Sequence, residues 1–186
     1  MRSLTLTPIL FALPSLSELV NRQFPHLIIP VNANEPDRAY NTQLTGNITQ
    51  QIYTEISFDI PSNTATFCQL NFYLNTLPEI GAPWSLSGDP PFTFNISSLP
   101  ANSINKDTDT WKKRPSPIKT IATVTLTQAG NATIKGGAVV PCPKGQTSQF
   151  LLHPGSDERA FAFNWFELDY PASEGGPHGV VFDMLK

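Results

Sequence analysis

The chain has 186 residues, the length of one ordinary domain with enough material to bury a hydrophobic core. Its 12 basic and 15 acidic residues give a net charge of −3, which argues against nucleic acid and anionic lipid as ligands. Only 15 % of the residues are charged and 18 are proline, a mixture typical of an extracellular β-protein with long, turn-rich connections.

The first 17 residues have the features of a secretory signal. One basic residue precedes an apolar run that is too short to span a bilayer, and Ser15 and Ser17 favour cleavage after Ser17. A disordered N-terminal tail is the alternative interpretation. We expect residues 1–17 to be a signal peptide, residues 18–23 to form a short tail and residues 24–186 to form a single domain. No later segment is apolar over the length that a membrane span needs.

Period-two alternation of apolar and polar residues predicts about nine strands. In chain order they are expected at 26–31, 51–60, 66–74, 92–96, 118–126, 133–140, 148–152, 160–168 and 179–182. The strands at 51–60, 66–74 and 118–126 have the clearest pattern, and each is expected to place one face in the core and one in water. The connections 76–91 and 97–117 look irregular. The sequence therefore predicts an all-β fold, an antiparallel, jelly-roll-like β-sandwich with one disulfide.

The two cysteines, Cys68 and Cys142, allow only one intramolecular bridge. Cys68 lies on the inward face of its predicted strand, and Cys142 follows an apolar run. We interpret the pair as a structural disulfide, with two free buried thiols as the alternative. The spacing does not fit a redox-active Cys-X-X-Cys site, and neither cysteine has a His or Cys at zinc-ligand spacing.

Three asparagines, Asn47, Asn95 and Asn131, each begin an Asn-X-Ser/Thr acceptor site for N-glycosylation. Each falls in a stretch with loop or strand-edge character, where a bulky sugar is tolerated. Together with the apolar N-terminus and the even cysteine count, these sites predict a secreted, extracellular or cell-wall glycoprotein.

Motifs for catalysis, phosphate binding and metal binding are missing from the sequence. We expect His26, His153 and His178 to have structural or surface roles. We therefore expect no enzymatic activity, no cofactor and no metal.

Three pairs of acids are close in sequence: Asp107 and Asp109, Asp157 and Glu158, and Glu167 and Asp169. We interpret the first two pairs as solvated turn acids, with a weak calcium site as the alternative. The third pair would share one face of a strand end. Acids at a strand end more often keep an exposed sheet edge from aggregating than serve as the paired carboxylates of a glycoside hydrolase.

Tryptophans give the only plausible ligand-binding signal. Trp84 and Trp111 lie in the two long connections, where indole rings could stack on sugars. The alternative is that both cover the ends of the sandwich. Trp165 shares a strand face with Phe161 and Phe163 and is expected in the core.

The segment 111–114 combines tryptophan with three consecutive basic residues. It fits a docking site for an acidic polymer, a dibasic processing site or a plain solvated loop.

Five segments carry a family resemblance: FPHLIIPV at 24–31, the Cys-X-Leu-X-Phe strand at 68–72, CPKGQT at 142–147, NWF at 164–166 and GVVF at 179–182. Through them the chain resembles a family of fungal secreted domains named after the ubiquitin-three binding protein But-two C-terminal domain. The resemblance implies a β-sandwich with Cys68 bonded to Cys142, typical of fungal cell-surface or secreted proteins. The family name implies contact with a ubiquitin-like activating enzyme, and the resemblance brings no catalytic residues.

The sequence as a whole predicts a non-catalytic secreted or cell-surface fungal glycoprotein that acts as a binding or structural module. Its expected partners are a cell-wall polysaccharide or a surface protein, with no nucleic acid and no transmembrane segment. The alternative function is a carbohydrate-binding domain that uses Trp84 and Trp111.

Overall fold

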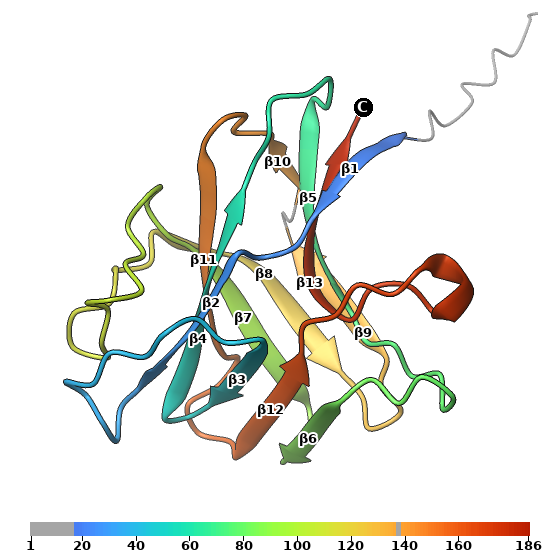
Figure 1. Ribbon diagram of the computed structural model, residues 1–186. Coiled ribbons are helices and arrows are strands. Elements are labelled where there is room, and N and C mark those ends of the chain that lie inside the picture. Colours follow the sequence, from blue (N-terminus) through green and yellow to red (C-terminus); the bar gives the residue numbers. More distant parts are fainter. Residues whose placement is uncertain (1–16, 137–138) are drawn as a thin grey trace, which may run out of the picture.

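The computed structural model describes residues 17–136 and 139–186, which form strands joined by turns and long loops (Figure 1). The predicted signal peptide lies outside these residues except for Ser17. The strands are β1 (Leu19–Gln23), β2 (Leu27–Asn32), β3 (Thr45–Thr49), β4 (Ile52–Asp59), β5 (Phe67–Tyr73), β6 (Trp84–Gly88), β7 (Phe92–Ser98), β8 (Lys119–Leu126), β9 (Ala132–Gly136), β10 (Val139–Pro141), β11 (Thr147–Pro154), β12 (Phe161–Phe166) and β13 (Gly179–Leu185). A single 3-10 turn, η1 (Ala172–Glu174), precedes β13. Within the described ranges, no helix is long and apolar enough to cross a membrane.

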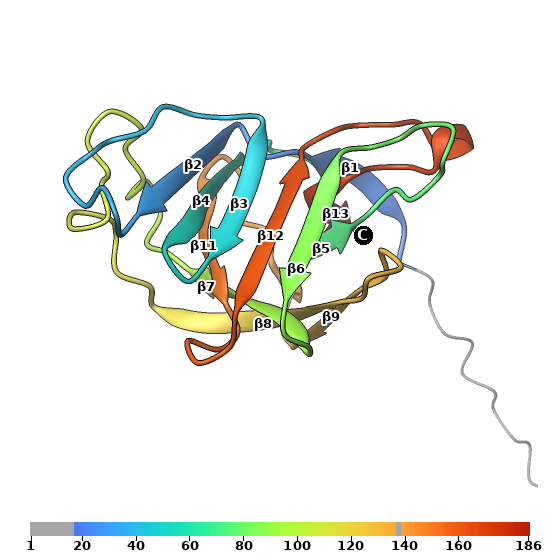
Figure 2. The same cartoon turned by 90° about the horizontal axis from the view of Figure 1, so that it is seen from below.

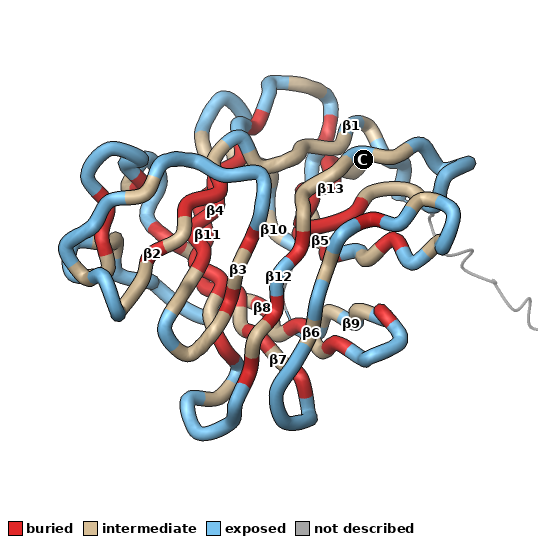
Figure 3. The backbone as a smooth tube through the Cα atoms, turned by 60° about the horizontal axis from the view of Figure 1, so that its bottom comes forward, coloured by how far each residue is buried: buried red, intermediate tan, exposed pale blue. Residues whose placement is uncertain are grey.

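The strands form three antiparallel sheets. A six-stranded sheet has the order β2-β4-β11-β7-β8-β9, a four-stranded sheet β1-β13-β5-β10, and a three-stranded sheet β3-β12-β6 (Figure 2). One cluster of buried side chains draws on all three sheets, and the buried segments converge on the centre of the molecule (Figure 3). The expected all-β, sandwich-like fold with one disulfide is thereby confirmed.

The three sheets meet at a group of four aromatic rings. The ring of Phe72 on β5 lies 5.3 Å from that of Phe94 on β7, 5.6 Å from Phe163 and 5.4 Å from Trp165, the last two on β12. All three contacts are edge-to-face, the geometry that aromatic quadrupoles favour. Trp165 is fully buried, as its strand face predicted.

Each of the nine predicted strands is present, and the segment expected as one strand at 133–140 forms the two strands β9 and β10. The sequence interpretation missed β1, β3 and β6. The expectation of a tail at 18–23 was wrong, because β1 pairs with β13 over this segment. Arg22 fixes β1 through two bonds to the buried Asp183 carboxylate, from Nε at 2.5 Å and from Nη2 at 3.0 Å.

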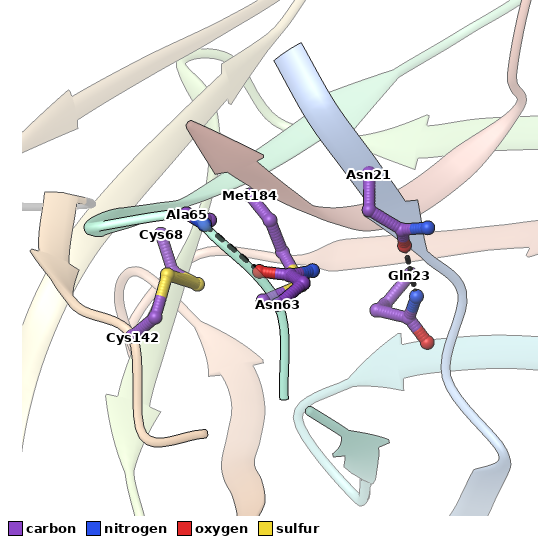
Figure 4. The surroundings of a disulfide bond; sticks show 7 residues. All are labelled: Asn21, Gln23, Asn63, Ala65, Cys68, Cys142 and Met184. Atoms are coloured by element: carbon purple, nitrogen blue, oxygen red, sulfur yellow. Dashed lines mark hydrogen bonds between the residues drawn. A yellow bond between two sulfur atoms is a disulfide. The ribbon is translucent and has the colours of Figure 1, made fainter. Parts of the chain in front are cut away.

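The disulfide joins Cys68 on β5 to Cys142, which directly follows β10, at a Cα–Cα distance of 4.9 Å (Figure 4). Cys68 is fully buried in the main core, and Cys142 packs against it. The bridge therefore secures the short edge strand β10, which has only three residues paired with β5.

Replacing both Cys68 and Cys142 by alanine should lower the free energy of unfolding by about 4 kcal/mol, because opening a loop of this length restores entropy to the unfolded chain. Urea denaturation of the double variant and the parent chain measures the difference. The matched control is Ser62→Ala, an exposed position in the preceding loop. A double variant as stable as the control would contradict a stabilising role for the bridge.

Candidate functional site

The loop between β7 and β8, residues 99–118, covers part of the outer face of the six-stranded sheet. A second apolar cluster, separate from the main core, lies beneath it and consists of Ile29, Val31, Leu99, Ile104 and Leu151. Because β2 and β11 contribute to this cluster, these strands are buried on both faces. Figure 1 shows the loop in yellow-green at the left edge of the molecule.

Hydrogen bonds to a buried amide fix the loop on the sheet. Gln149 of β11 is only 5 % exposed, and its Oε1 accepts from the backbone N–H groups of Ser103, at 2.7 Å, and Ile104, at 3.0 Å. Its Nε2 donates to Ser57 Oγ on β4 at 3.1 Å. The outer face of β4 was expected in water; that expectation was wrong for Glu55 and Ser57, which the loop buries.

Beneath the loop two acids, Glu55 and Asp109, share a buried position. Glu55 is fully buried, and Asp109, expected as a solvated turn acid, is only 5 % exposed. Burial, and next the charge of Asp109, raise the pKa of Glu55 to about 8, although Arg114 acts in the opposite direction. Asp109 Oδ2 accepts from the Asn105 N–H at 2.7 Å, while burial raises the pKa of Asp109. At neutral pH burial therefore keeps Glu55 protonated, and neither oxygen of its carboxyl group has a hydrogen-bond partner among the described residues.

Above this acid pair an aromatic and basic group reaches the surface. The guanidinium of Arg114 lies 3.9 Å from the Trp111 ring centroid, and the Tyr53 ring lies 4.7 Å from that of Trp111. Arg114 Nη1 also donates to the Trp111 carbonyl oxygen. All three side chains are half-buried, whereas Lys112 and Lys113 are exposed. We call these five residues the Trp111 patch.

A serine and a histidine lie next to each other on the same sheet face. Ser97 Oγ is 3.0 Å from His153 Nε2 and 3.1 Å from Thr120 Oγ1, and His153 Nδ1 is 3.1 Å from the Pro154 carbonyl oxygen. A catalytic serine must reach a substrate carbonyl, but Ser97, next to the last residue of β7, is only 2 % exposed. The contacts therefore form a structural polar chain across β11, β7 and β8, as expected for His153.

The structure does not bring the two candidate sugar-binding tryptophans together. Trp84 opens β6 and pairs with Trp165, so it lies on the inner side of its sheet and packs against the main core. Trp111 packs against the second cluster, in a loop that lies away from β6 in both ribbon views. Carbohydrate binding by these residues stays a prediction.

The three acceptor asparagines differ in exposure. Asn131 is exposed in the turn between β8 and β9, whereas Asn47 on β3 and Asn95 on β7 are half-buried. Their glycosylation also stays a prediction.

Glu167 has a role that the sequence did not indicate. Its Oε2 accepts from Trp165 Nε1 at 2.9 Å and from the Val180 N–H at 3.0 Å, and burial raises its pKa to about 8. The expectation that these two acids protect an exposed strand edge was wrong for Glu167, while Asp169 is exposed. Both acids line a groove of about 560 Å³ with His26, but His26 contacts Asp59, at 3.4 Å, and not these acids.

Sequence comparison gives one match of this chain to a protein family. The model of the ubiquitin 3 binding protein But2 C-terminal domain matches residues 23–171. No curated protein matches the chain. The match covers every residue of the Trp111 patch and both acids beneath it.

Glu55 and Glu167, whose pKa values are both raised to about 8, predict that stability falls between pH 6.5 and 8. The ordinary pKa of glutamate is 4.5, so the unfolded chain releases these protons above pH 4.5, whereas the folded chain keeps them on Glu55 and Glu167. Their stabilising effect is therefore complete below that pH and is lost as the pH rises to about 8, by at most about 1.4 kcal/mol per pH unit for each group. His153 and His178, with lowered pKa values, act in the opposite direction and only below pH 6.5.

Urea unfolding at several pH values in this window measures the slope. Glu55→Gln replaces the carboxyl group by a neutral amide of the same shape and should remove about half of the slope. Asp107→Asn, a change at an exposed acid of the same loop, is the matched control and should leave it unchanged. An unaltered slope in Glu55→Gln would count against a buried, protonated Glu55.

Proposed function

Because the chain belongs to the family of the ubiquitin 3 binding protein But2 C-terminal domain, we propose that it is an exported, non-catalytic binding module that docks an acidic partner protein on the Trp111 patch. The family description names a binding protein, which supports a binding role over a catalytic one. The partner would be a surface protein outside the cell. The stacked Trp111 and Arg114 beside Tyr53 are the observation that carries the proposal.

The composition of the patch supports protein recognition. Tryptophan, tyrosine and arginine are the residues that most often dominate binding energy at protein interfaces. Here Arg114 lies over the Trp111 ring, the Tyr53 ring packs against Trp111 at a tilt of 59°, and two exposed lysines extend the positive charge. Lys112 Nζ contacts Asp37 at 2.8 Å, so Lys113 and Arg114 are better placed to attract an acidic partner. Positive charge of this kind raises the association rate and favours acidic surfaces.

The loop beneath the patch supports a preformed binding surface. The Gln149 hydrogen bonds and the second apolar cluster both join the loop to the sheet. A side chain held in place before binding loses little conformational freedom when a partner docks. The patch therefore needs no folding step in order to bind.

Three observations support export. The Cys68–Cys142 disulfide persists most readily in an oxidising compartment. The chain also has three acceptor sites for N-glycans, and its first 17 residues resemble a secretory signal. Each is independent of the binding surface.

Substituting Trp111 by alanine should weaken binding to isolated fungal cell walls about tenfold, the effect of losing roughly 1.4 kcal/mol at an interface hot spot. The glycosylated full chain is mixed with walls, and the bound fraction is measured at increasing protein concentration. Raising the salt from about 0.15 M to about 0.5 M should weaken binding further, because screening reduces the attraction of Lys113 and Arg114. Trp84→Phe, a change at a half-buried tryptophan of another sheet, is the matched control.

Pretreatment of the walls separates the partner classes. Protease treatment should abolish binding if the partner is a protein. Binding that survives protease, disappears after glucanase and weakens in both tryptophan variants would replace the proposal with carbohydrate recognition. Unchanged binding of Trp111→Ala would remove the patch from consideration.

A further inference from the structure

A groove of about 510 Å³ opens where β2 and β4 lie beside β3 and β12. The connection between β2 and β3 forms one wall through Arg38, Tyr40 and Gln43, and Asn32 at the end of β2 contributes a further amide. Asn47 of β3 and Asn164 of β12, which face each other as cross-strand partners, complete the lining. Its volume is within the range of sites for small ligands, about 300–1,000 Å³.

Asn47 is both a groove residue and a glycan acceptor. Its neighbours Gly46 and Ile48 are buried, so strand alternation directs the Asn47 side chain to the outer face. Its backbone is held by Thr54, whose Oγ1 accepts from the Asn47 N–H at 3.0 Å and donates to the Asn47 carbonyl oxygen at 2.6 Å. A sugar attached to this asparagine would therefore begin at a fixed point inside the groove.

The lining suits an uncharged sugar. The side-chain amides of Asn32, Gln43 and Asn164 offer donors and acceptors that match hydroxyl and acetamide groups. The charge of Arg38 is compensated by Glu35 at 2.9 Å. Tyr40 contributes an aromatic ring, the kind of surface on which the C–H face of a sugar packs.

We propose that the groove receives the first N-acetylglucosamine units of a glycan attached to Asn47, so that the chain binds its own carbohydrate. The proposal rests on the export and glycosylation that belong to the proposed function. Asn131 provides the contrast, because it lies in an exposed turn.

The test compares release of the two glycans from the native chain. The full chain is expressed in a glycosylating fungal host and treated with an N-glycan-releasing amidase, and mass spectrometry of glycopeptides follows each site with time. We expect glycan release from Asn47 to be about tenfold slower than from Asn131, because a tenfold difference corresponds to roughly 1.4 kcal/mol of stabilisation by contacts between the sugar and the groove. After denaturation the two rates should be equal.

Two variants of one residue separate sugar contact from simple crowding. Tyr40→Ala removes the ring and should bring release at Asn47 close to the rate at Asn131. Tyr40→Phe keeps the ring, loses the hydroxyl's hydrogen bonds with Glu35 and Asn32, and should preserve the slow release. Asn131 within each sample is the internal control for protein stability.

Each other outcome overturns the proposal. Equal native rates, or slow release that Tyr40→Ala leaves unchanged, would show that the groove does not hold the glycan. If Asn131 carries a glycan and Asn47 does not, the proposed glycan binding in the groove is rejected, while the proposed export is unaffected. If all three acceptor sites lack sugar in that host, the proposed export fails together with this inference.

Discussion

The fold depends on the packing of Phe72 against rings from both neighbouring sheets. Without this junction the three sheets would have separate, small apolar faces, and each would remain partly exposed to water. The junction also determines local sequence. Gly46 lies directly over the Trp165 indole, and a Cβ at this position would be 2.1 Å from ring atoms, so only glycine lets β3 approach. A fully buried indole N–H needs an acceptor, which Glu167 provides.

Glu167 in turn joins two sheets. Its Oε2 accepts from Trp165 on β12 and from Val180 on β13, while its Oε1 is buried without a hydrogen-bond partner among the described residues. Burial raises the pKa of this carboxyl group, although the hydrogen bonds from the two N–H groups act in the opposite direction. The residue that joins the sheets therefore also makes stability depend on pH. Gly179 permits this arrangement, because a Cβ there would lie 2.2 Å from the Glu167 carboxylate.

The strands that the sequence predicted are those whose own residues encode one buried face. β4, β5 and β8 alternate clearly, and the aromatic residues of β12 indicated the core correctly. β1, β3 and β6 were missed because polar or small residues dominate them and their positions depend on partners far along the chain. Asp183, the partner of Arg22, is an example: 161 residues separate the pair.

The candidate site could be predicted only in part, for the same reason. Trp111 and the basic residues after it are visible as a local motif, but the contact of Trp111 with Tyr53 requires that the loop fold back across β4. Alternation in β4 could not reveal that its outer face is covered. Glu55 therefore looked like a solvated residue, and nothing near it in sequence indicated Asp109.

Covering both faces of β4 gives the loop its rigidity and also its sensitivity to protons. Glu55 faces Asp109 and Arg114 from the loop, with Tyr53 beside it on β4 and the half-buried His153 against Tyr53 on β11. Of these groups only Arg114 is a permanent cation, and its guanidinium is already stacked on Trp111. When Glu55 loses its proton, two buried negative charges share that single guanidinium, and the free energy that holds the loop on the sheet decreases. The Trp111 patch is therefore held most firmly where Glu55 stays protonated, at mildly acidic pH.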